Sequence, residues 1–189
     1  MKAKITKYRI RCAQKLSGRI LDVGAGEGGY THNLGADVVS LDLDYENLKR
    51  ISSKKVLASA KHLPFPDNTF DGVWSCAVLE HVKINFIPEA IRVTKPGGII
   101  YILTPNRHSF YDPLKRLLGY GDWWSNEGHV RLYSVRELRA WGKVSGEVWW
   151  APGLDQLARI IPALGHTLML RIDVNSHTKR NVNINNAKE

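Results

Sequence analysis

Short apolar runs alternate with polar segments along the first half of the chain. Each run is bounded by glycine, proline or charged residues, which is typical of buried strands in a sheet. Two further apolar runs follow nearer the C-terminus. The predicted strands cover residues 19–24, 37–43, 55–59, 71–78, 99–104, 147–152 and 166–174.

Helices are predicted between most of these strands. Asp44 supplies an N-cap for one of them, and Ser134 with Glu137 forms a capping box for another. Because strands and helices alternate, we expect an α/β fold whose mostly parallel sheet is covered on both faces. The predicted helices cover residues 2–16, 28–34, 44–52, 85–94, 112–118, 134–142 and 154–161.

Length and composition favour a single globular domain. The chain has 189 residues, of which 43% are hydrophobic and 24% charged. We expect the domain to cover residues 1–174 and the polar, asparagine-rich residues 175–189 to form a frayed tail. Cys12 and Cys76 lie far apart and suggest no metal-ligand cluster, so no metal is predicted. No run predicts a membrane helix or a secretory signal, and we expect a cytoplasmic location.

The formal net charge of +9 is concentrated near the N-terminus. Residues 1–19 hold seven basic side chains and no acidic one. Such an asymmetry suits an anionic partner, namely a phosphorylated substrate, a nucleic acid or an anionic membrane surface. A solubilising face on the first helix explains it equally well.

The glycine-rich segment "LDVGAGEGGYT" (21–31) allows two interpretations. Gly24, Gly26 and Gly29 satisfy the G-x-G-x-x-G pattern of dinucleotide-binding proteins. Gly24, Gly26 and Gly28, with Asp22 just before them, suit S-adenosylmethionine instead. Either ligand would approach the backbone closely because glycine has no side chain in the way.

Two aspartates bear on this choice. Asp42 ends a predicted strand, where its carboxylate could accept hydrogen bonds from ribose hydroxyls, a feature of both ligands. Asp22 lies inside an apolar strand, where an unpaired charge would be costly. An ammonium group would stabilise that charge, whereas a pyrophosphate would be repelled. Loop N–H groups could also satisfy it.

Two later stretches resemble a known family. They read "SAKHLPFPDNTFDGVWSCAVLEHV" (59–82) and "EAIRVTKPGGIIYILTPN" (89–106). Together with 19–58 they are similar to class I S-adenosylmethionine-dependent methyltransferases of type 11, especially the ubiquinone and menaquinone branch. "GHVRLYSVREL" (128–138) extends the resemblance more weakly. It implies a Rossmann-like three-layer sandwich with a seven-stranded sheet and an antiparallel last strand.

The resemblance also implies cofactor contacts for S-adenosylmethionine, whose product is S-adenosylhomocysteine. Serine stands at position 59, where the family often has an aspartate that accepts from the adenine amino group. The implied residues are Asp22, Gly24, Ala25 and Gly26 beside the methionine and ribose, Asp42 on the ribose, Leu43 on the adenine face, Ser59, Ala60 and Lys61 at the adenine edge, and Ser75 and Cys76 at the ammonium.

On the acceptor side, histidines and aromatic residues are the candidates. His81 is the leading candidate for a general base, and His129 is the second, although either could be structural. Residues 105–133 are a predicted acceptor lid whose Trp123 and Trp124 could contact substrate or only fill a cap. Tyr8 could close over the methyl donor or face the core.

Three functions therefore remain in view. The favoured one is in-line methyl transfer to a small acceptor, aromatic or anionic, by a monomer or a homodimer. A nucleic-acid methyltransferase is a second, although "SCAV" (75–78) stands where an N-P-P-Y loop would lie. A non-catalytic protein that binds the cofactor or a partner is the third.

Overall fold

The computed structural model describes residues 7–35, 37–109, 128–148 and 152–179 of the chain. The strands are β1 (Arg19–Val23), β2 (Asp37–Asp42), β3 (Lys54–Leu57), β4 (Phe70–Cys76), β5 (Thr94–Pro105), β6 (Lys143–Glu147) and β7 (Thr167–Asp173). The α-helices are α1 (Lys7–Ala13), α2 (Tyr45–Lys49), α3 (Ile87–Val93), α5 (Val135–Arg139) and α6 (Pro152–Ile160), and the 3₁₀ turns are η1 (Thr31–Asn33), η2 (Leu79–His81) and η4 (Pro162–Leu164).

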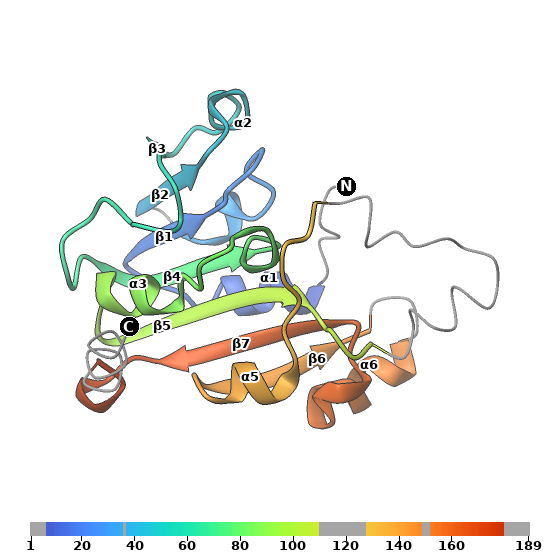
Figure 1. Cartoon of the computed structure of the whole chain (residues 1–189). Helices are drawn as coiled ribbons and strands as arrows, with labels where there is room; N and C mark the ends of the chain where they lie inside the picture. Colours follow the sequence, from blue (N-terminus) through green and yellow to red (C-terminus); the bar gives the residue numbers. More distant parts are fainter. Residues whose placement is uncertain (1–6, 36, 110–127, 149–151, 180–189) are drawn as a thin grey trace.

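The strands form one sheet in the order β3-β2-β1-β4-β5-β7-β6 (Figure 1). Neighbouring strands run parallel from β3 to β5, and β7 is antiparallel to both β5 and β6. The predicted seven-stranded, mostly parallel sheet with an antiparallel last strand is confirmed. Because β1 has β2 on one side and β4 on the other, the chain reverses its winding direction beside β1, where such folds open a crevice.

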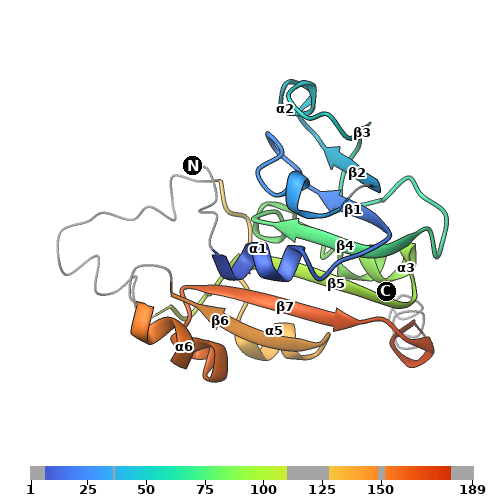
Figure 2. The same ribbon diagram turned by 180° about the vertical axis from the view of Figure 1, so that it is seen from behind.

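Two apolar layers hold this sheet between helices. Figures 1 and 2 show α3 and α5 on one face and α1 on the other. Side chains alternate between the faces along each strand. In β4, for example, Val73 packs into the cluster that includes α3, and Trp74 packs into the cluster that includes α1. This three-layer arrangement fixes the carboxyl ends of the parallel strands at one edge of the sheet.

Several helix and strand predictions are wrong in extent. The helix predicted over 28–34 is only the 3₁₀ turn η1, because Gly28 adopts a left-handed conformation with φ of +82°. The strand predicted over 147–152 is β6 over Lys143–Glu147, an edge strand too poor in apolar residues to recognise. The first helix ends at Ala13 rather than at residue 16. Residues 1–6, 112–118, 149–151 and 180–189, on which parts of these predictions fall, lie outside the described residues.

The capping predictions are confirmed. The Asp44 side chain accepts a hydrogen bond from the N–H of Glu46 at the start of α2. Ser134 and Glu137 form the reciprocal capping box of α5. At the far end of the described chain, Lys179 donates to Asn68 Oδ1 at 2.6 Å and to the carbonyl of Arg92 at 3.1 Å. These two bonds hold Lys179 against the turn before β4 and the end of α3.

Not all of the basic N-terminal segment faces solvent. Arg9 is 4% exposed and forms an ion pair with the equally buried Glu147 of β6. Arg9 therefore cannot belong to a surface patch that meets an anionic partner. It instead ties α1 to the last two strands, because its guanidinium also donates to Thr167 Oγ1 at 3.2 Å.

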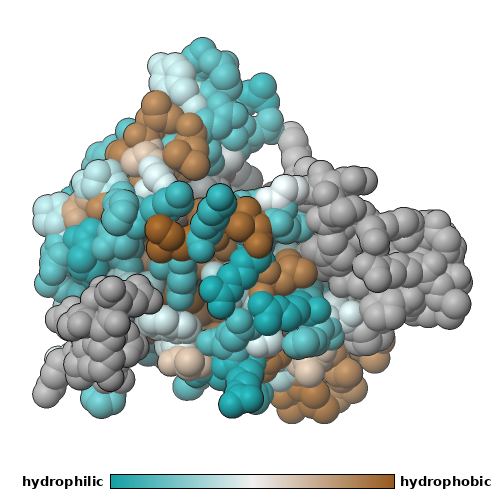
Figure 3. All heavy atoms as spheres, in the orientation of Figure 1, coloured by the Kyte–Doolittle hydropathy of each residue, from teal (hydrophilic) through white to brown (hydrophobic). Residues whose placement is uncertain are grey.

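An apolar patch lies on the surface of the molecule. Figure 3 shows a hydrophobic patch over α6. The exposed apolar side chains there are Leu154, Leu157, Ile160 and Ile161. Among the described residues, none of the helices has the length and apolar character needed to cross a membrane.

Candidate functional site

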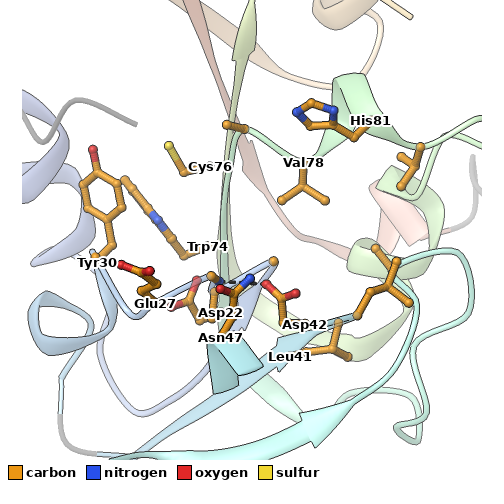
Figure 4. Close-up of a pocket in the computed structure, with 18 of the residues that line it drawn as sticks. Asp22, Glu27, Tyr30, Leu41, Asp42, Asn47, Trp74, Cys76, Val78 and His81 are labelled. Carbon is orange, nitrogen blue, oxygen red and sulfur yellow. Dashed lines mark hydrogen bonds between the residues drawn. The ribbon is translucent and has the colours of Figure 1, made fainter. Parts of the chain in front are cut away.

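A pocket of about 790 Å³ opens at the carboxyl ends of β1, β2 and β4 (Figure 4). This is the edge and the crossover point that the strand order singles out. The lining residues are Asp22, Gly24, Ala25, Gly26, Glu27, Gly29, Tyr30, Leu41, Asp42, Leu43, Asn47, Ala58, Ala60, Trp74, Cys76, Ala77, Val78, His81 and Val82.

The glycine loop after β1 forms one wall. Gly24 and Ala25 donate backbone hydrogen bonds to the carbonyl of Leu41 at 2.7 and 3.0 Å, so the loop crosses the end of β2. Gly24 has φ of +67°, and a Cβ there would lie 2.1 Å from Val78 Cγ2. A Cβ on Gly26, φ +53°, would meet nothing within 4 Å. Gly24 therefore lets the two walls approach each other, and Gly26 leaves room for a ligand beside its backbone.

Carboxylates dominate this wall. Figure 4 shows Asp22, Glu27 and Asp42 gathered at the ends of β1 and β2. Asp42 Oδ2 accepts from the N–H of Gly26 at 2.8 Å, and its Oδ1 accepts from that of Asp44 at 2.9 Å. A carboxylate has about four acceptor positions, so Asp42 can still receive ribose hydroxyls.

Asp22 is the most deeply buried of the three carboxylates. It is 3% exposed, and Thr31 Oγ1 donates to its Oδ2 at 2.8 Å. Burial raises the pKa of Asp22 from its usual range to about 7, and the Thr31 hydrogen bond only partly opposes this effect. A cation beside Asp22 would therefore favour the ionised form of its carboxyl group at neutral pH.

The opposite wall comes from the segment that follows β4. Ala77 adopts φ of +59°, unusual for a residue with a Cβ, and its N–H is held by the carbonyl of Leu103 at 3.0 Å. Burial raises the pKa of the Cys76 thiol to about 11, although the Arg9 guanidinium acts against this. The thiol is therefore neutral and unsuited to be a nucleophile, which supports a packing role for Cys76.

Trp74 forms the inner end of the pocket. Its ring lies between those of Tyr30 and Tyr101, with centroid distances of 5.2 and 6.1 Å. The Trp74 Nε1–H is buried, and no hydrogen-bond partner for it exists among the described residues. The Trp74 ring therefore closes this end of the pocket against the apolar cluster that includes α1.

These features fit S-adenosylmethionine, whose bound form carries an ammonium, a sulfonium and a ribose. Asp22 offers negative charge to the cationic end and Asp42 offers acceptors to the ribose, whereas the Glu27 carboxylate is already paired with Arg50. Leu43 is 69% exposed at the pocket rim, where an apolar side chain can cover an adenine ring. The same carboxylates would repel a pyrophosphate.

Most of the predicted cofactor residues lie in this pocket, but three do not. Ser59 and Lys61 form a turn in which the Lys61 N–H donates to Ser59 Oγ at 3.2 Å. Ser75 is fully buried within the sheet, because alternation along β4 turns it away from the face that carries Trp74 and Cys76. Predicted residues that do line the pocket are Asp22, Gly24, Ala25, Gly26, Asp42, Leu43, Ala60, Cys76 and His81.

The predicted acceptor residues are distributed differently. Tyr8 does not line the pocket, because its hydroxyl lies 3.3 Å from Ser145 Oγ and its ring lies under the Arg159 guanidinium. His129 also lies outside the lining, but it stacks beside His81 at a ring-centroid distance of 4.8 Å. Trp123 and Trp124 lie outside the described residues.

The sequence analysis does not predict some of the residues that line the pocket, although local patterns point to two of them. Trp74 follows from the alternation of β4, since it shares a face with Cys76. Asn47 lies three residues after the N-cap Asp44, on the first turn of α2. Other lining residues, such as Tyr30 and Val78, reach the pocket through loop conformations that no local pattern predicts. The remaining missed residues are Glu27, Gly29, Leu41, Ala58, Ala77 and Val82.

Comparison with known proteins gives consistent results. Residues 21–102 match the family model described as a methyltransferase domain. The chain is 32% identical over 162 residues to 2-methyl-6-phytyl-1,4-hydroquinone methyltransferase of Synechocystis, covering 71% of this chain and 50% of that protein. It is 30% identical to demethylmenaquinone methyltransferase of Renibacterium salmoninarum, covering 78% and 65% respectively. The chain spans about half the length of the first curated relatives that it matches.

Solved structures support the same fold. An S-adenosylmethionine-dependent methyltransferase from Thermotoga maritima superposes with a TM-score of 0.65 at 18% identity, covering 86% of this chain and 85% of that one. At this identity the likeness establishes the fold alone. The family match, the relatives and the fold agree with the motifs read from the sequence. The chain therefore belongs to the class I S-adenosylmethionine-dependent methyltransferase family.

Proposed function

We propose that this protein transfers the methyl group of S-adenosylmethionine to a small aromatic acceptor. The observation that carries the proposal is the acidic pocket at the crossover point, where Asp22 and Asp42 lie on one wall beside the open backbone of Gly26. A ligand with a cationic end and a ribose complements this wall, and a dinucleotide pyrophosphate does not.

The residues of the pocket divide the work of binding. Asp42 holds the ribose, and its own position is fixed by the N–H groups of Gly26 and Asp44. Asp22 becomes ionised when a cation lies next to it. When bound, S-adenosylmethionine supplies a methyl group already activated by the neighbouring sulfonium.

The opposite wall receives the acceptor. Val78 and Val82 provide apolar surface there, and His81 lies beside them at the side of the pocket away from the carboxylates (Figure 4). These residues hold the acceptor in line with the methyl group and exclude water, which are the main contributions a protein makes to such a transfer.

The acceptor class comes from the relatives, which are named for a hydroquinone and for demethylmenaquinone. We infer that this chain also methylates a hydroxylated aromatic ring. A reducing, cytoplasmic setting is part of this proposal, since Cys12 and Cys76 are both free thiols.

Calorimetry tests the cofactor assignment. We expect S-adenosylmethionine and S-adenosylhomocysteine to bind, and NAD not to. Asp42→Ala should weaken S-adenosylhomocysteine binding by about tenfold or more, the effect of losing charged hydrogen bonds. Asp44→Ala is the matched control, because Asp44 caps α2 and is not part of the pocket lining. Tighter binding of NAD, or equal effects of the two variants, would contradict the assignment.

A second assay tests the acceptor. Radiolabelled S-adenosylmethionine is supplied with a panel of substituted hydroquinones, a naphthoquinol and total RNA. Label should appear in the ring compounds. Label that appears only in RNA, and that nuclease removes, would replace the small-molecule proposal with the nucleic-acid one.

A further inference from the structure

Backbone hydrogen bonds bring two distant segments together beside the pocket. The carbonyl of Glu80, in η2, accepts from the N–H of Val130 at 2.8 Å and from that of Arg131 at 3.1 Å. His81 Nδ1 lies 3.3 Å from the carbonyl of Gly128. The two backbone hydrogen bonds fix how residues 128–131 lie against η2. The contact with Gly128 orients the imidazole ring of His81.

This arrangement gathers Glu80, His81 and His129. One carboxylate oxygen and one nitrogen from each ring all lie within 4.8 Å of one another. The two rings are tilted by 34°. The Glu80 carboxylate is 1% exposed and is oriented by Thr104 Oγ1, which donates to its Oε2 at 3.1 Å. Within the described part of the chain, this is the single group with three such ligand atoms.

We propose that Glu80, His81 and His129 bind a divalent transition-metal ion. Two imidazoles and one carboxylate are the donor set that zinc and ferrous iron share in proteins, with coordination positions left open for a further ligand. Ligands of one zinc ion lie no more than about 4.2 Å apart. A small shift of the exposed His81 side chain that keeps its contact with Gly128 can close the remaining difference. The contact between His81 and the Gly128 carbonyl is of the kind that orients metal-bound histidines.

The position of the group gives the metal a use. His81 belongs to the pocket lining and His129 lies behind it, so open coordination positions would face the acceptor side. An oxygen of a hydroxylated acceptor could occupy one of them. In this arrangement His81 is a ligand rather than the general base that the sequence suggested, because a nitrogen bound to a metal has no lone pair for a proton. This use rests on the proposed function, whereas metal binding itself does not.

Cobalt titration of tag-free, chelator-treated protein tests the site. We expect one Co²⁺ per chain, with visible absorption bands of a nitrogen-and-oxygen site. His81→Gln, His129→Gln and Glu80→Gln should each weaken Co²⁺ binding at least tenfold, since even outer-shell changes have effects of about that size. His177→Gln is the matched control, because His177 is exposed and follows β7 at the opposite edge of the sheet.

Two measurements keep the outcome clear. S-adenosylhomocysteine affinity, measured on each variant, shows that the pocket is folded and separates failure of the metal site from failure of the proposed function. X-ray absorption of the zinc-loaded natural protein needs no variant, and two imidazoles with oxygen should surround the zinc. Unchanged cobalt binding in the His81→Gln/His129→Gln double variant, or a shell containing sulfur or lacking imidazole, would overturn the proposal.

Discussion

The two walls of the pocket are built in different ways. On the cofactor wall, Asp42 meets Gly26 and Asp22 meets Thr31 across 16 and 9 residues of sequence. On the acceptor side, His81 meets Gly128 across 47 residues. Outside the pocket lining, the buried pair of Arg9 with Glu147 spans 138. The first wall is made by the backbone conformation of one segment. The second wall forms only after segments far apart in the chain have come together, and the Arg9–Glu147 pair shows the same long-range dependence where α1 packs against the sheet.

The largest expected effect is on the long-range side. Arg9→Met should lower the free energy of unfolding by about 3–5 kcal/mol, because it leaves Glu147 buried without its charge partner. Urea unfolding measures this effect. The double variant Arg9→Met/Glu147→Leu should be more stable than the single one, since no unpaired charge remains. A loss below about 1 kcal/mol in the single variant would mean that the pair does not hold α1 to the sheet.

A smaller effect is expected on the cofactor wall, where the comparison can be made within one loop. Gly24→Ala and Gly26→Ala both force an alanine into a left-handed conformation, at about 1–2 kcal/mol each. Only Gly24→Ala also drives a methyl group into Val78, which adds roughly 1–3 kcal/mol. Thermal unfolding should rank the two variants in that order, and Val78→Ala should partly rescue Gly24→Ala. Equal melting temperatures, or no rescue, would show that the two walls are not in contact there.

What the sequence predicts follows the same division. The strands from β1 to β5 and β7, the glycine loop and the caps at Asp44 and Ser134 depend on neighbours in the chain, and they lie close to their predicted positions. Asp22 and Asp42 both line the pocket. The helix after β1 was predicted wrongly even though its signal is local. Three glycines close together favour left-handed turns over helix, and the described residues between β1 and β2 hold only the short turn η1.

The acceptor side was less predictable because its signals are not local. The basic N-terminal segment does not reveal that Arg9 is buried, because its partner Glu147 lies on the far strand β6. Tyr8 likewise contacts Ser145 and Arg159, which are far from it in the sequence. His81 and His129 were recognised one by one, but their pairing with Glu80 required the backbone bonds from residues 130 and 131.

The most gradual expected effect is a pH dependence confined to Asp22, which belongs to the cofactor wall, because it is spread over several pH units. Its pKa is about 7 in the folded protein and near 4 in the unfolded chain, so the folded state binds the extra proton between these values. The ligand-free protein should therefore lose stability as pH rises through this window, by at most about 1.4 kcal/mol per pH unit, and should lose no more from Asp22 above pH 7.

S-adenosylmethionine affinity should change in the opposite direction. Its cation stabilises the ionised carboxylate, so binding should strengthen up to about pH 7 and then level off. Calorimetry and urea unfolding between pH 5 and 8 measure both slopes on the same samples. Asp22→Asn cannot ionise and should flatten both, while Thr31→Val removes the hydrogen bond that favours the ionised form and should move both curves to higher pH. Slopes that persist in Asp22→Asn would assign the titration to another group and would leave Asp22 a structural residue of the loop.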